Sequence, residues 1–203
     1  MKDIARLLDV SLSSVSLWVR DIELEDVQQA SLRSRAARRR GQASAEWARA
    51  HRRAAQESGR RAARRGDPLH IAGCMLFWAE GAKARNAVVF TNSDPVMVGF
   101  FARFLRECFA VPDAKIKIAC NLFGDHVGRK NEVEDFWLEA ARLPRSQLRK
   151  STVNVYSKHS KKKRRNKLPY GTCGLVVNDT ALVQAIYGAI QEYAGFDRPE
   201  WLG

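Results

Sequence analysis

The chain has 203 residues, of which 45% are hydrophobic, and it carries a formal net charge of +13 at pH 7. This length suits one or two domains with a buried core, and no apolar run reaches the roughly 18 residues that a membrane span requires. The four cysteines form no C-x-x-C pair and the four histidines are scattered, so we expect reduced thiols and no zinc site. The N-terminus also lacks a signal-peptide pattern, and together these features predict a cytoplasmic protein.

The positive charge is concentrated in two short segments. Residues 33–65 contain 12 arginines against Glu46 and Glu57, and Lys158–Lys167 contains seven lysines or arginines and no acid. The rest of the chain is therefore net negative. Such a concentration is the electrostatic footprint of a nucleic-acid-binding protein.

Residues 1–26 predict two short helices joined by a tight turn. The turn is expected at Asp9, and Ser11 is a plausible N-cap for the second helix, which should bury Val15 and Trp18. The side chains of the first helix that we expect to face inward are Ile4, Ala5 and Leu8.

The turn and the V-S-x-x-x-V-x-x-W spacing of residues 10–18 resemble bacterial helix-turn-helix domains. The resemblance implies a second helix in the major groove of DNA and a protein associated with the bacterial nucleoid. Short serine side chains near the helix start can hydrogen-bond phosphates or base edges. The candidate DNA contacts are Leu12, Ser13, Ser16, Leu17 and Arg20. Against this interpretation, residues 2–26 are net acidic, and many unrelated proteins contain two short amphipathic helices.

Residues 27–66 are dominated by arginine and alanine, with Gly41, Gly59 and Gly66 as interruptions. Both residue types favour helix, but from residue 33 onward Trp47 is the only large apolar side chain of the segment, so no apolar stripe forms. We therefore expect a basic linker or helix that contacts the DNA backbone without reading its sequence.

The stretch Ile71–Gly81, I-A-G-C-M-L-F-W-A-E-G, is the most informative in the chain. It predicts a buried helix with Asp67 as N-cap, Pro68 in its first turn and Gly81 as its stop. Glu80 is unusual there, because a carboxylate in the last turn faces the negative end of the helix dipole and costs roughly 0.3–1 kcal/mol. A divalent cation beside Glu80 would reverse the sign of that penalty.

Residues 67–203 are predicted to form an α+β domain around this helix. The expected strands span residues 87–91, 115–122, 153–156 and 170–177, and the further helices span 94–109, 131–143 and 181–193. The helix over 94–109 should bury Val98, Phe101, Phe104 and Leu105, which recur at helical spacing.

The G-C-M-L-F-W-A-E-G helix, the V-F-T-N-S-D-P segment after it and the paired C-terminal strands resemble a LAGLIDADG homing-endonuclease domain over roughly residues 68–195. The resemblance implies a central motif helix at Gly73–Gly81 among helices that cover a small antiparallel sheet. It places the motif's metal-binding acid at Glu80, where glutamate replaces the usual aspartate, and implies Mg²⁺ as cofactor if the chain is catalytically active. A single motif implies a homodimer in which each subunit contributes Glu80.

Two further departures from the family pattern accompany the resemblance. Trp78 stands where the motif often has its first acid, and one strand rather than two is predicted between the motif helix and the next helix. Lys83, just past the motif, is the first candidate for stabilising negative charge on a phosphate, and Lys117 is a weaker one. Asp94 precedes Pro95 and is interpreted as an N-cap rather than as a second metal ligand.

The basic segment Lys158–Lys167 lies between two predicted strands. In a sheet that straddles DNA, loops of this kind contact the phosphate backbone, although a basic loop can also serve only for solubility or as a localisation signal. The candidate phosphate contacts are Lys161, Lys162, Lys163, Arg164 and Arg165.

Two hypotheses of different classes follow. In the first, the protein binds double-stranded DNA through a helix-turn-helix and a LAGLIDADG-like domain, as a transcriptional regulator that has lost cleavage. In the second, it is a homodimeric, Mg²⁺-dependent DNA endonuclease that uses Glu80. An RNA- or ribosome-associated protein would also fit the charge but leaves the motif helix unexplained. None of these hypotheses involves a membrane or a small-molecule cofactor.

Overall fold

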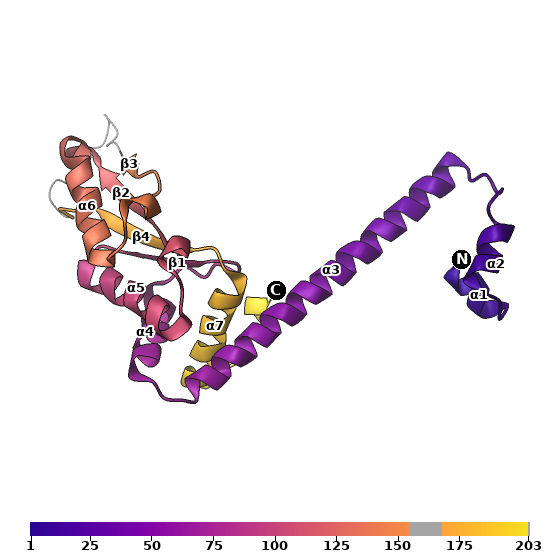
Figure 1. Cartoon of the computed structure of the whole chain (residues 1–203), viewed down its shortest axis with the longest axis horizontal. Helices are drawn as coiled ribbons and strands as arrows, with labels where there is room; N and C mark the ends of the chain where they lie inside the picture. Colours follow the sequence, from indigo (N-terminus) through magenta and orange to yellow (C-terminus); the bar gives the residue numbers. More distant parts are fainter. Residues whose placement is uncertain (155–167, 203) are drawn as a thin grey trace. The chain divides into compact units, whose positions relative to one another are not determined.

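The computed structural model describes residues 1–154 and 168–202. Its contacts divide the chain into two compact units, Met1–Trp47 and Ala48–Gly203, whose elements are labelled in Figure 1. The second unit thus begins inside the segment that was predicted to be a linker or helix. Among the described residues, no helix is both long enough and apolar enough to cross a membrane.

The N-terminal unit contains α1 (Lys2–Leu7), α2 (Leu12–Trp18) and the first part of α3 (Asp26–Ala63). The predicted turn and cap are confirmed. Asp9 has a left-handed backbone with φ of 52°, and the Ser11 hydroxyl accepts a hydrogen bond of 3.1 Å from the backbone N–H of Ser14. The chain therefore leaves α1 and enters α2 as the turn chemistry requires.

Within Met1–Trp47, all of which is described, Val15 is the only buried residue. The prediction that Trp18, Ile4 and Leu8 face inward is wrong, since they are 59%, 43% and 53% exposed. The helices α1 and α2 contact each other, but two short helices have too few facing positions to cover more than one side chain. The unit therefore leaves most of its apolar surface exposed.

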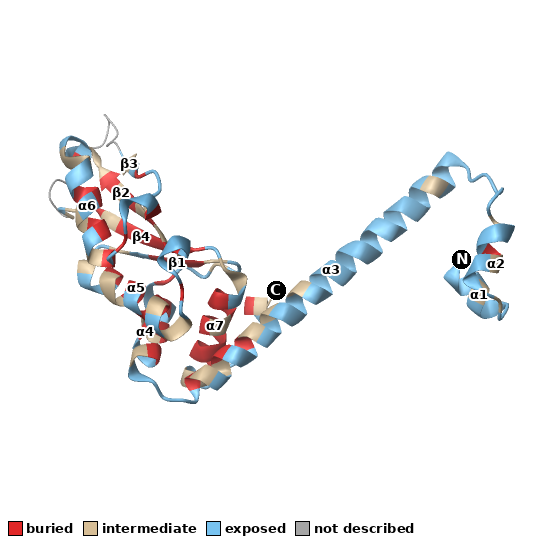
Figure 2. Ribbon diagram, viewed as in Figure 1, coloured by how far each residue is buried: buried red, intermediate tan, exposed pale blue. Residues whose placement is uncertain are grey.

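The second part of α3 packs closely against α7 (Thr180–Ala194). A Cβ atom added at Gly59 would overlap the carbonyl oxygen of Ala185, and one at Gly188 would overlap that of Gln56. Both glycines are therefore required by the close approach of the two backbones. The buried residues of α3 all lie in this part, as the colouring of Figure 2 shows. Residues from Ala48 onward thus belong to the folded domain.

Helix α4 (Pro68–Glu80) has the predicted cap and boundaries. The Asp67 carboxylate accepts hydrogen bonds from the backbone N–H groups of Leu69, at 2.8 Å, and His70, at 3.2 Å. Gly81 ends the helix with φ of −75°, which other residues can also adopt. Glycine is needed there because a Cβ atom would overlap the ring of Phe77.

One side of α4 is buried and the other is exposed. The buried residues are His70, Gly73, Cys74 and Phe77. Ile71 is 37% exposed, and Ala72 and Ala79 are exposed as well. The prediction of a buried helix therefore holds for one side of α4 and is wrong for the other.

The four described strands form one mixed sheet in the order β1-β4-β2-β3. They are β1 (Val88–Asn92), β2 (Lys117–Phe123), β3 (Thr152–Asn154) and β4 (Thr172–Val177). Strand β4 is antiparallel to β1 and to β2, whereas β3 is parallel to β2. The expectation of an antiparallel sheet is therefore wrong at β3. The chain passes from β2 to β3 through α6 (Lys130–Ala141), and a helical crossover of this kind permits parallel pairing.

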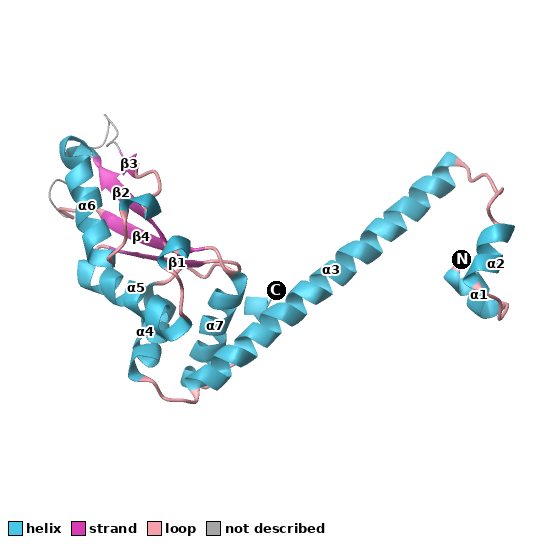
Figure 3. Cartoon of the chain, viewed as in Figure 1, coloured by secondary structure: helices cyan, strands magenta, loops and turns pink. Residues whose placement is uncertain are grey.

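The helices cover one face of the sheet, which gives the predicted α+β class (Figure 3). Helix α5 (Pro95–Phe109) contacts β1 and β4, α6 contacts β2, and both α4 and α7 contact β1. The Asp94 carboxylate caps α5 by accepting from the N–H of Val96 at 2.8 Å, which confirms its interpretation as an N-cap. The strand residues buried under the helices are Val88, Phe90, Ile118, Cys120, Leu122, Cys173, Leu175 and Val177. The apolar positions predicted for α5 are buried too.

Candidate nucleic-acid interface

The opposite face of the sheet is not covered by the described helices and carries mostly small or polar side chains. Successive strand residues point to opposite faces, so every residue between two core positions belongs to this face. Thr91, Thr152 and Asn154 are exposed, Gly174 is buried, and the other residues of this face are half-buried. The set, which we call the open face, comprises Val89, Thr91, Lys117, Ala119, Asn121, Phe123, Thr152, Asn154, Thr172, Gly174 and Val176.

A row of hydrogen-bonding side chains crosses the open face. Asn121 on β2 is paired in register with Thr172 on β4 and with Thr152 on β3. The Asn121 amide Nδ2 donates to the Thr172 hydroxyl at 3.3 Å, which fixes the orientation of that amide. Amide and hydroxyl groups of this kind contact the phosphates and base edges of nucleic acids. The row therefore offers both donors and acceptors to a polar ligand.

Lys117 supplies a positive charge on the same face. It lies on β2 and pairs in register with Val176 of β4. Its ammonium donates to the side-chain carbonyl of Gln147 at 2.5 Å, so the long side chain is held in place. A lysine ammonium carries three protons, and this bond uses one of them. The structure thus brings Lys117 onto the face that carries Asn121 and Thr172.

The residues at the centre of the open face have short side chains or none. Gly174 on β4 is paired in register with Thr91 on β1 and with Ala119 on β2. A Cβ atom at Gly174 would lie 3.2 Å from the Thr91 hydroxyl oxygen, so even a methyl group would crowd that hydroxyl. Gly174 itself is buried, so neighbouring atoms already occupy the space beside its backbone.

Basic residues border the open face at the start of β3. Arg149 and Lys150 are exposed there, and the Arg149 N–H donates to the Ile118 carbonyl at 2.7 Å. The five candidates Lys161, Lys162, Lys163, Arg164 and Arg165 lie outside the described residues, as does the end of the strand predicted over 153–156. Their role as phosphate contacts stays a prediction.

A buried carboxylate anchors this border, and the sequence reasoning missed it. Glu134 on α6 is 4% exposed. It accepts a hydrogen bond from the Ser151 hydroxyl at 2.7 Å and forms ion pairs with Arg145 at 3.2 Å and with Lys130 at 3.7 Å. Glu134 thereby ties the residue just before β3 to α6. The Lys130–Glu134 spacing of one helical turn was the available signal in the sequence.

Glu80 lies exposed at the end of α4. Lys83 turns back onto the same helix end. Its ammonium donates to the carbonyl oxygens of Trp78 and Gly81, each at 2.7 Å, and approaches that of Phe77 at 3.4 Å. Burial and the nearby Arg198 lower the pKa of Lys83, while Glu80 opposes this effect. Lys83 therefore acts as a C-terminal cap of α4, and its catalytic role stays a prediction.

One chain does not by itself fit a magnesium site. Among the described residues, no group of three or more His, Cys, Asp or Glu side chains is placed to hold a metal ion. Glu80 is a single carboxylate next to a lysine, and Mg²⁺ demands a complete octahedral shell of oxygen ligands. A second carboxylate, from another copy of the chain, would have to complete the set.

The three buried cysteines are poor nucleophiles. All four are free, and Cys74, Cys120 and Cys173 are buried, as the sequence predicts. Burial raises the pKa of Cys74 and Cys173, and it raises that of Cys120 to about 11. Thiols with raised pKa values hold little thiolate at neutral pH and react slowly.

The candidate residues of α2 lie in a net acidic stretch, residues 2–26, with exposed apolar side chains. Leu12 and Leu17 are 47% and 62% exposed, and Ser13 and Ser16 are exposed as well. Arg20 follows the helix and forms an ion pair of 3.5 Å with Asp21. The structure places these side chains at the surface, and their contact with DNA stays a prediction.

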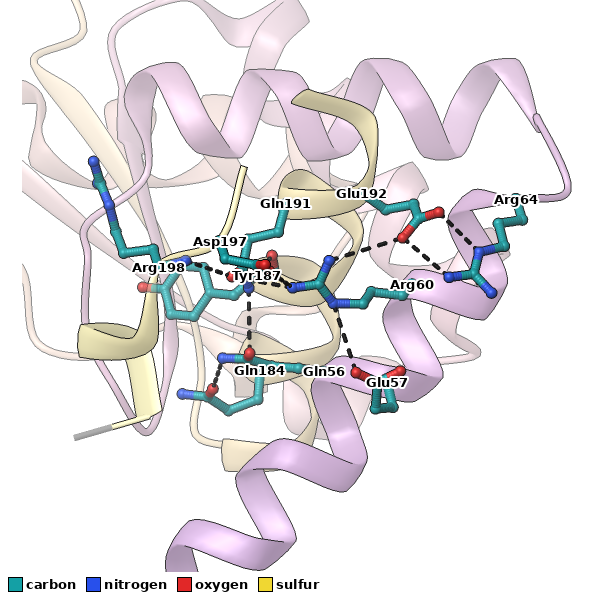
Figure 4. A network of polar contacts seen from close by, with 10 residues as sticks. All are labelled: Gln56, Glu57, Arg60, Arg64, Gln184, Tyr187, Gln191, Glu192, Asp197 and Arg198. Carbon is teal, nitrogen blue, oxygen red and sulfur yellow. Dashed lines mark hydrogen bonds and ion pairs between the residues drawn. The ribbon is translucent and has the colours of Figure 1, made fainter. Parts of the chain in front are cut away.

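Three arginines of the predicted backbone-binding segment are used within the C-terminal domain, and Figure 4 shows two of them, Arg60 and Arg64. Arg52 donates to the Leu202 carbonyl at 2.8 Å. Arg60 forms ion pairs with Asp197 and with Glu192, and Arg64 binds Glu192 at 2.8 Å. Beside them, buried Gln56 donates to Gln184 at 2.7 Å and accepts from Gln191 at 3.2 Å. These arginines therefore secure α3 to α7 and to the C-terminal residues.

Comparisons with protein-family models, with curated proteins and with solved structures give no match.

Proposed function

We propose that the protein binds double-stranded DNA and combines its N-terminal helices with a LAGLIDADG-like domain, as a transcriptional regulator that has lost cleavage. The observation that carries the proposal is the open face. Its row of Asn121, Thr172 and Thr152, with Lys117 beside it, suits a phosphate backbone and base edges. The neighbouring segment Lys158–Lys167 has seven positive charges in the sequence, which adds affinity for phosphate.

The LAGLIDADG-like assignment is supported by the arrangement of the helices. Four helices cover one face of a small sheet, and the motif helix α4 contacts the sheet at β1. Its exposed side, with Ile71, Ala72 and Ala79, supports a homodimer in which two copies of α4 meet. Small side chains there would allow a close approach of the two helices.

Loss of cleavage is supported by the surroundings of Glu80. The described residues place no group of three or more potential metal ligands there, and the neighbouring Lys83 ammonium is occupied with main-chain carbonyls. The alternative, a homodimeric Mg²⁺-dependent endonuclease, is favoured by one observation. Glu80 stays exposed at the end of the motif helix and has no ion-pair partner among the described residues.

Binding is tested with a matched pair of charge variants. Asn121→Asp puts a carboxylate on the open face, and Asn131→Asp makes the same change at an exposed position in the first turn of α6, away from that face. Fluorescence anisotropy with a labelled duplex should show an affinity loss of about tenfold for Asn121→Asp, because the added charge repels phosphate. Asn131→Asp should bind like the wild type. Equal losses in both variants would refute the open face as the interface.

The same samples decide about cleavage. Supercoiled plasmid incubated with the wild-type protein and Mg²⁺ should stay intact while the anisotropy assay shows binding. Nicking that disappears in Glu80→Gln would instead establish the endonuclease alternative. Nicking that persists in Glu80→Gln would exclude Glu80 as its site.

A further inference from the structure

The first part of α3 is exposed along almost its whole length. All residues from Asp26 to Trp47 are exposed except Gln29, which is half-buried, and the whole of this stretch is described (Figure 2). The exposed large apolar side chains of this stretch, Val27, Leu32 and Trp47, are too widely spaced to form an apolar face. A helix whose side chains stay exposed gains little stability from tertiary packing, and a ligand that binds along it would stabilise it.

Arginines are dense on this helix and are not neutralised. Five of them fall between Arg33 and Arg40, and no carboxylate of the described residues forms an ion pair with any of the five. Arg33 approaches the Gln29 side-chain carbonyl at 3.4 Å, and Arg40 approaches the Ala36 carbonyl at 3.4 Å. Their charges are therefore available to a polyanion. By contrast, residues 2–25, which include α2, are net acidic.

Helical geometry sorts the five arginines into two rows. At about 100° per residue, Arg33 and Arg40 lie almost in line, two turns apart. Arg35, Arg38 and Arg39 form a second row, which begins about 140° around the helix axis from the first. The sector between the rows carries only small side chains from residue 30 onward, namely Ala30, Ser34, Ala37, Gly41, Ser44 and Ala45. The other side of the helix carries bulkier groups, including Leu32 and Trp47.

The dimensions of this helix match the major groove of duplex DNA. A helix with its side chains is about 10–12 Å wide, and the major groove is about 12 Å wide. A row of arginines on each side would reach the phosphates of the two strands, while the small side chains between them would let the backbone approach the groove floor. Protein partners fit this surface less well, because two arginine rows in register would repel each other in a symmetric helix pair.

We propose that residues 26–47 of α3 lie in the major groove of duplex DNA, with Arg33 and Arg40 on one strand and Arg35, Arg38 and Arg39 on the other. The groove-entering element is then α3 rather than α2. This inference rests on the proposed DNA binding and goes beyond it, because it assigns an element, an orientation and a groove.

The orientation is tested with two double variants of the full chain that carry the same substitutions. Ala30→Leu with Ala37→Leu adds bulk in the sector of small side chains, and Ala36→Leu with Ala43→Leu adds the same bulk about 120° around the helix axis, in the sector of Leu32 and Trp47. Charge is unchanged in both, and alanine and leucine both favour helix, so circular dichroism should show equal helix content. The first variant should lose about tenfold in duplex affinity through steric overlap, and the second should bind like the wild type. Equal affinities for the two variants would overturn the orientation.

The groove and the arginines are tested on the same duplex. Methylation of guanine N7, which faces the major groove, should be suppressed by the wild-type protein and by the second double variant but not by the first. Replacing the five arginines by glutamine should lower the slope of log affinity against log salt by about 4 to 5, because each phosphate contact contributes about 0.9. Two results would overturn the proposal while leaving DNA binding in place. One is N7 methylation in the bound duplex equal to that in the free duplex, and the other is a salt slope of the glutamine variant equal to that of the wild type. If the wild type itself binds no duplex, the proposed function fails instead.

Discussion

The two parts of α3 have similar compositions and opposite surroundings. Between Arg33 and Arg40 the arginines face solvent without carboxylate partners, whereas Arg60 and Arg64 are held by acidic residues of the C-terminal domain. The first part is exposed on all sides, and the second contacts α7 through glycines and buried glutamines. An arginine count in the sequence therefore overstates the charge that is free to bind nucleic acid, because part of it secures the fold.

The largest expected effect concerns packing, which distinguishes the second part of α3 from the first. Gly59→Ala should destabilise the protein by about 3 kcal/mol or more, since its Cβ would overlap the Ala185 carbonyl and the helices would have to separate. Gly41→Ala is the matched control, because nothing lies within 4 Å of its Cβ. It should be neutral or stabilise the helix by up to about 1 kcal/mol. Urea unfolding followed by circular dichroism measures the free energy of unfolding of both variants. Similar losses of stability in the two variants would contradict the difference between the two parts of α3.

A smaller expected effect distinguishes the roles of arginines in the two parts of α3. Arg60→Gln should cost about 1 kcal/mol of stability, a modest value because its partner Asp197 is 79% exposed and solvent screens the pair. The DNA affinity of the Arg60→Gln variant should depend on salt as strongly as that of the wild type. Arg35→Gln should leave stability unchanged within about 0.5 kcal/mol and lower the salt slope by about 0.9. Unfolding and anisotropy titrations on both variants check this, and the reverse pattern would exchange the roles of the two arginines.

The smallest effect is a pH dependence confined to the C-terminal domain. No histidine precedes His51 in the sequence, whereas His70 on α4 is buried and its Nδ1 lies 2.7 Å from the Tyr193 hydroxyl. Burial lowers the pKa of His70, so below its unfolded value of about 6.5 the unfolded chain binds more protons than the folded one. Stability should therefore be complete above that pH and decline as the pH falls below it.

Urea unfolding at pH 7.5 and 5.5 measures this decline. His70→Phe removes the titrating group and should unfold with a smaller difference between the two pH values than the wild type. A difference as large as that of the wild type would mean that other groups carry the pH dependence.

Local chemistry in the sequence predicted the start of α2, α4 and α5. Ser11, Asp67 and Asp94 each precede a helical run and accept hydrogen bonds from its first N–H groups, as their side chains suggest. The apolar spacing of α5 also predicted which of its residues are buried. Caps and periodicity act within a few residues, so they can be recognised without the fold.

Long-range contacts were the part that local patterns missed. The parallel pairing of β3 with β2 depends on how the chain returns after α6. The anchoring of Ser151 by Glu134 joins residues from different elements. The exposure of Trp18 follows from the lack of any described element that covers α1 and α2, although the spacing of the apolar residues suggested burial.

By itself, the sequence determined the helix starts, the α+β class and the concentration of positive charge, because these depend on neighbouring residues and on composition. Tertiary structure alone decided which arginines are neutralised, which side of α4 is exposed and which side chains share the open face. Those outcomes depend on residues far apart in the chain. Gly59 and Gly41 illustrate the difference, because each is a glycine within an arginine-rich helix, and only the approach of α7 makes one of them indispensable.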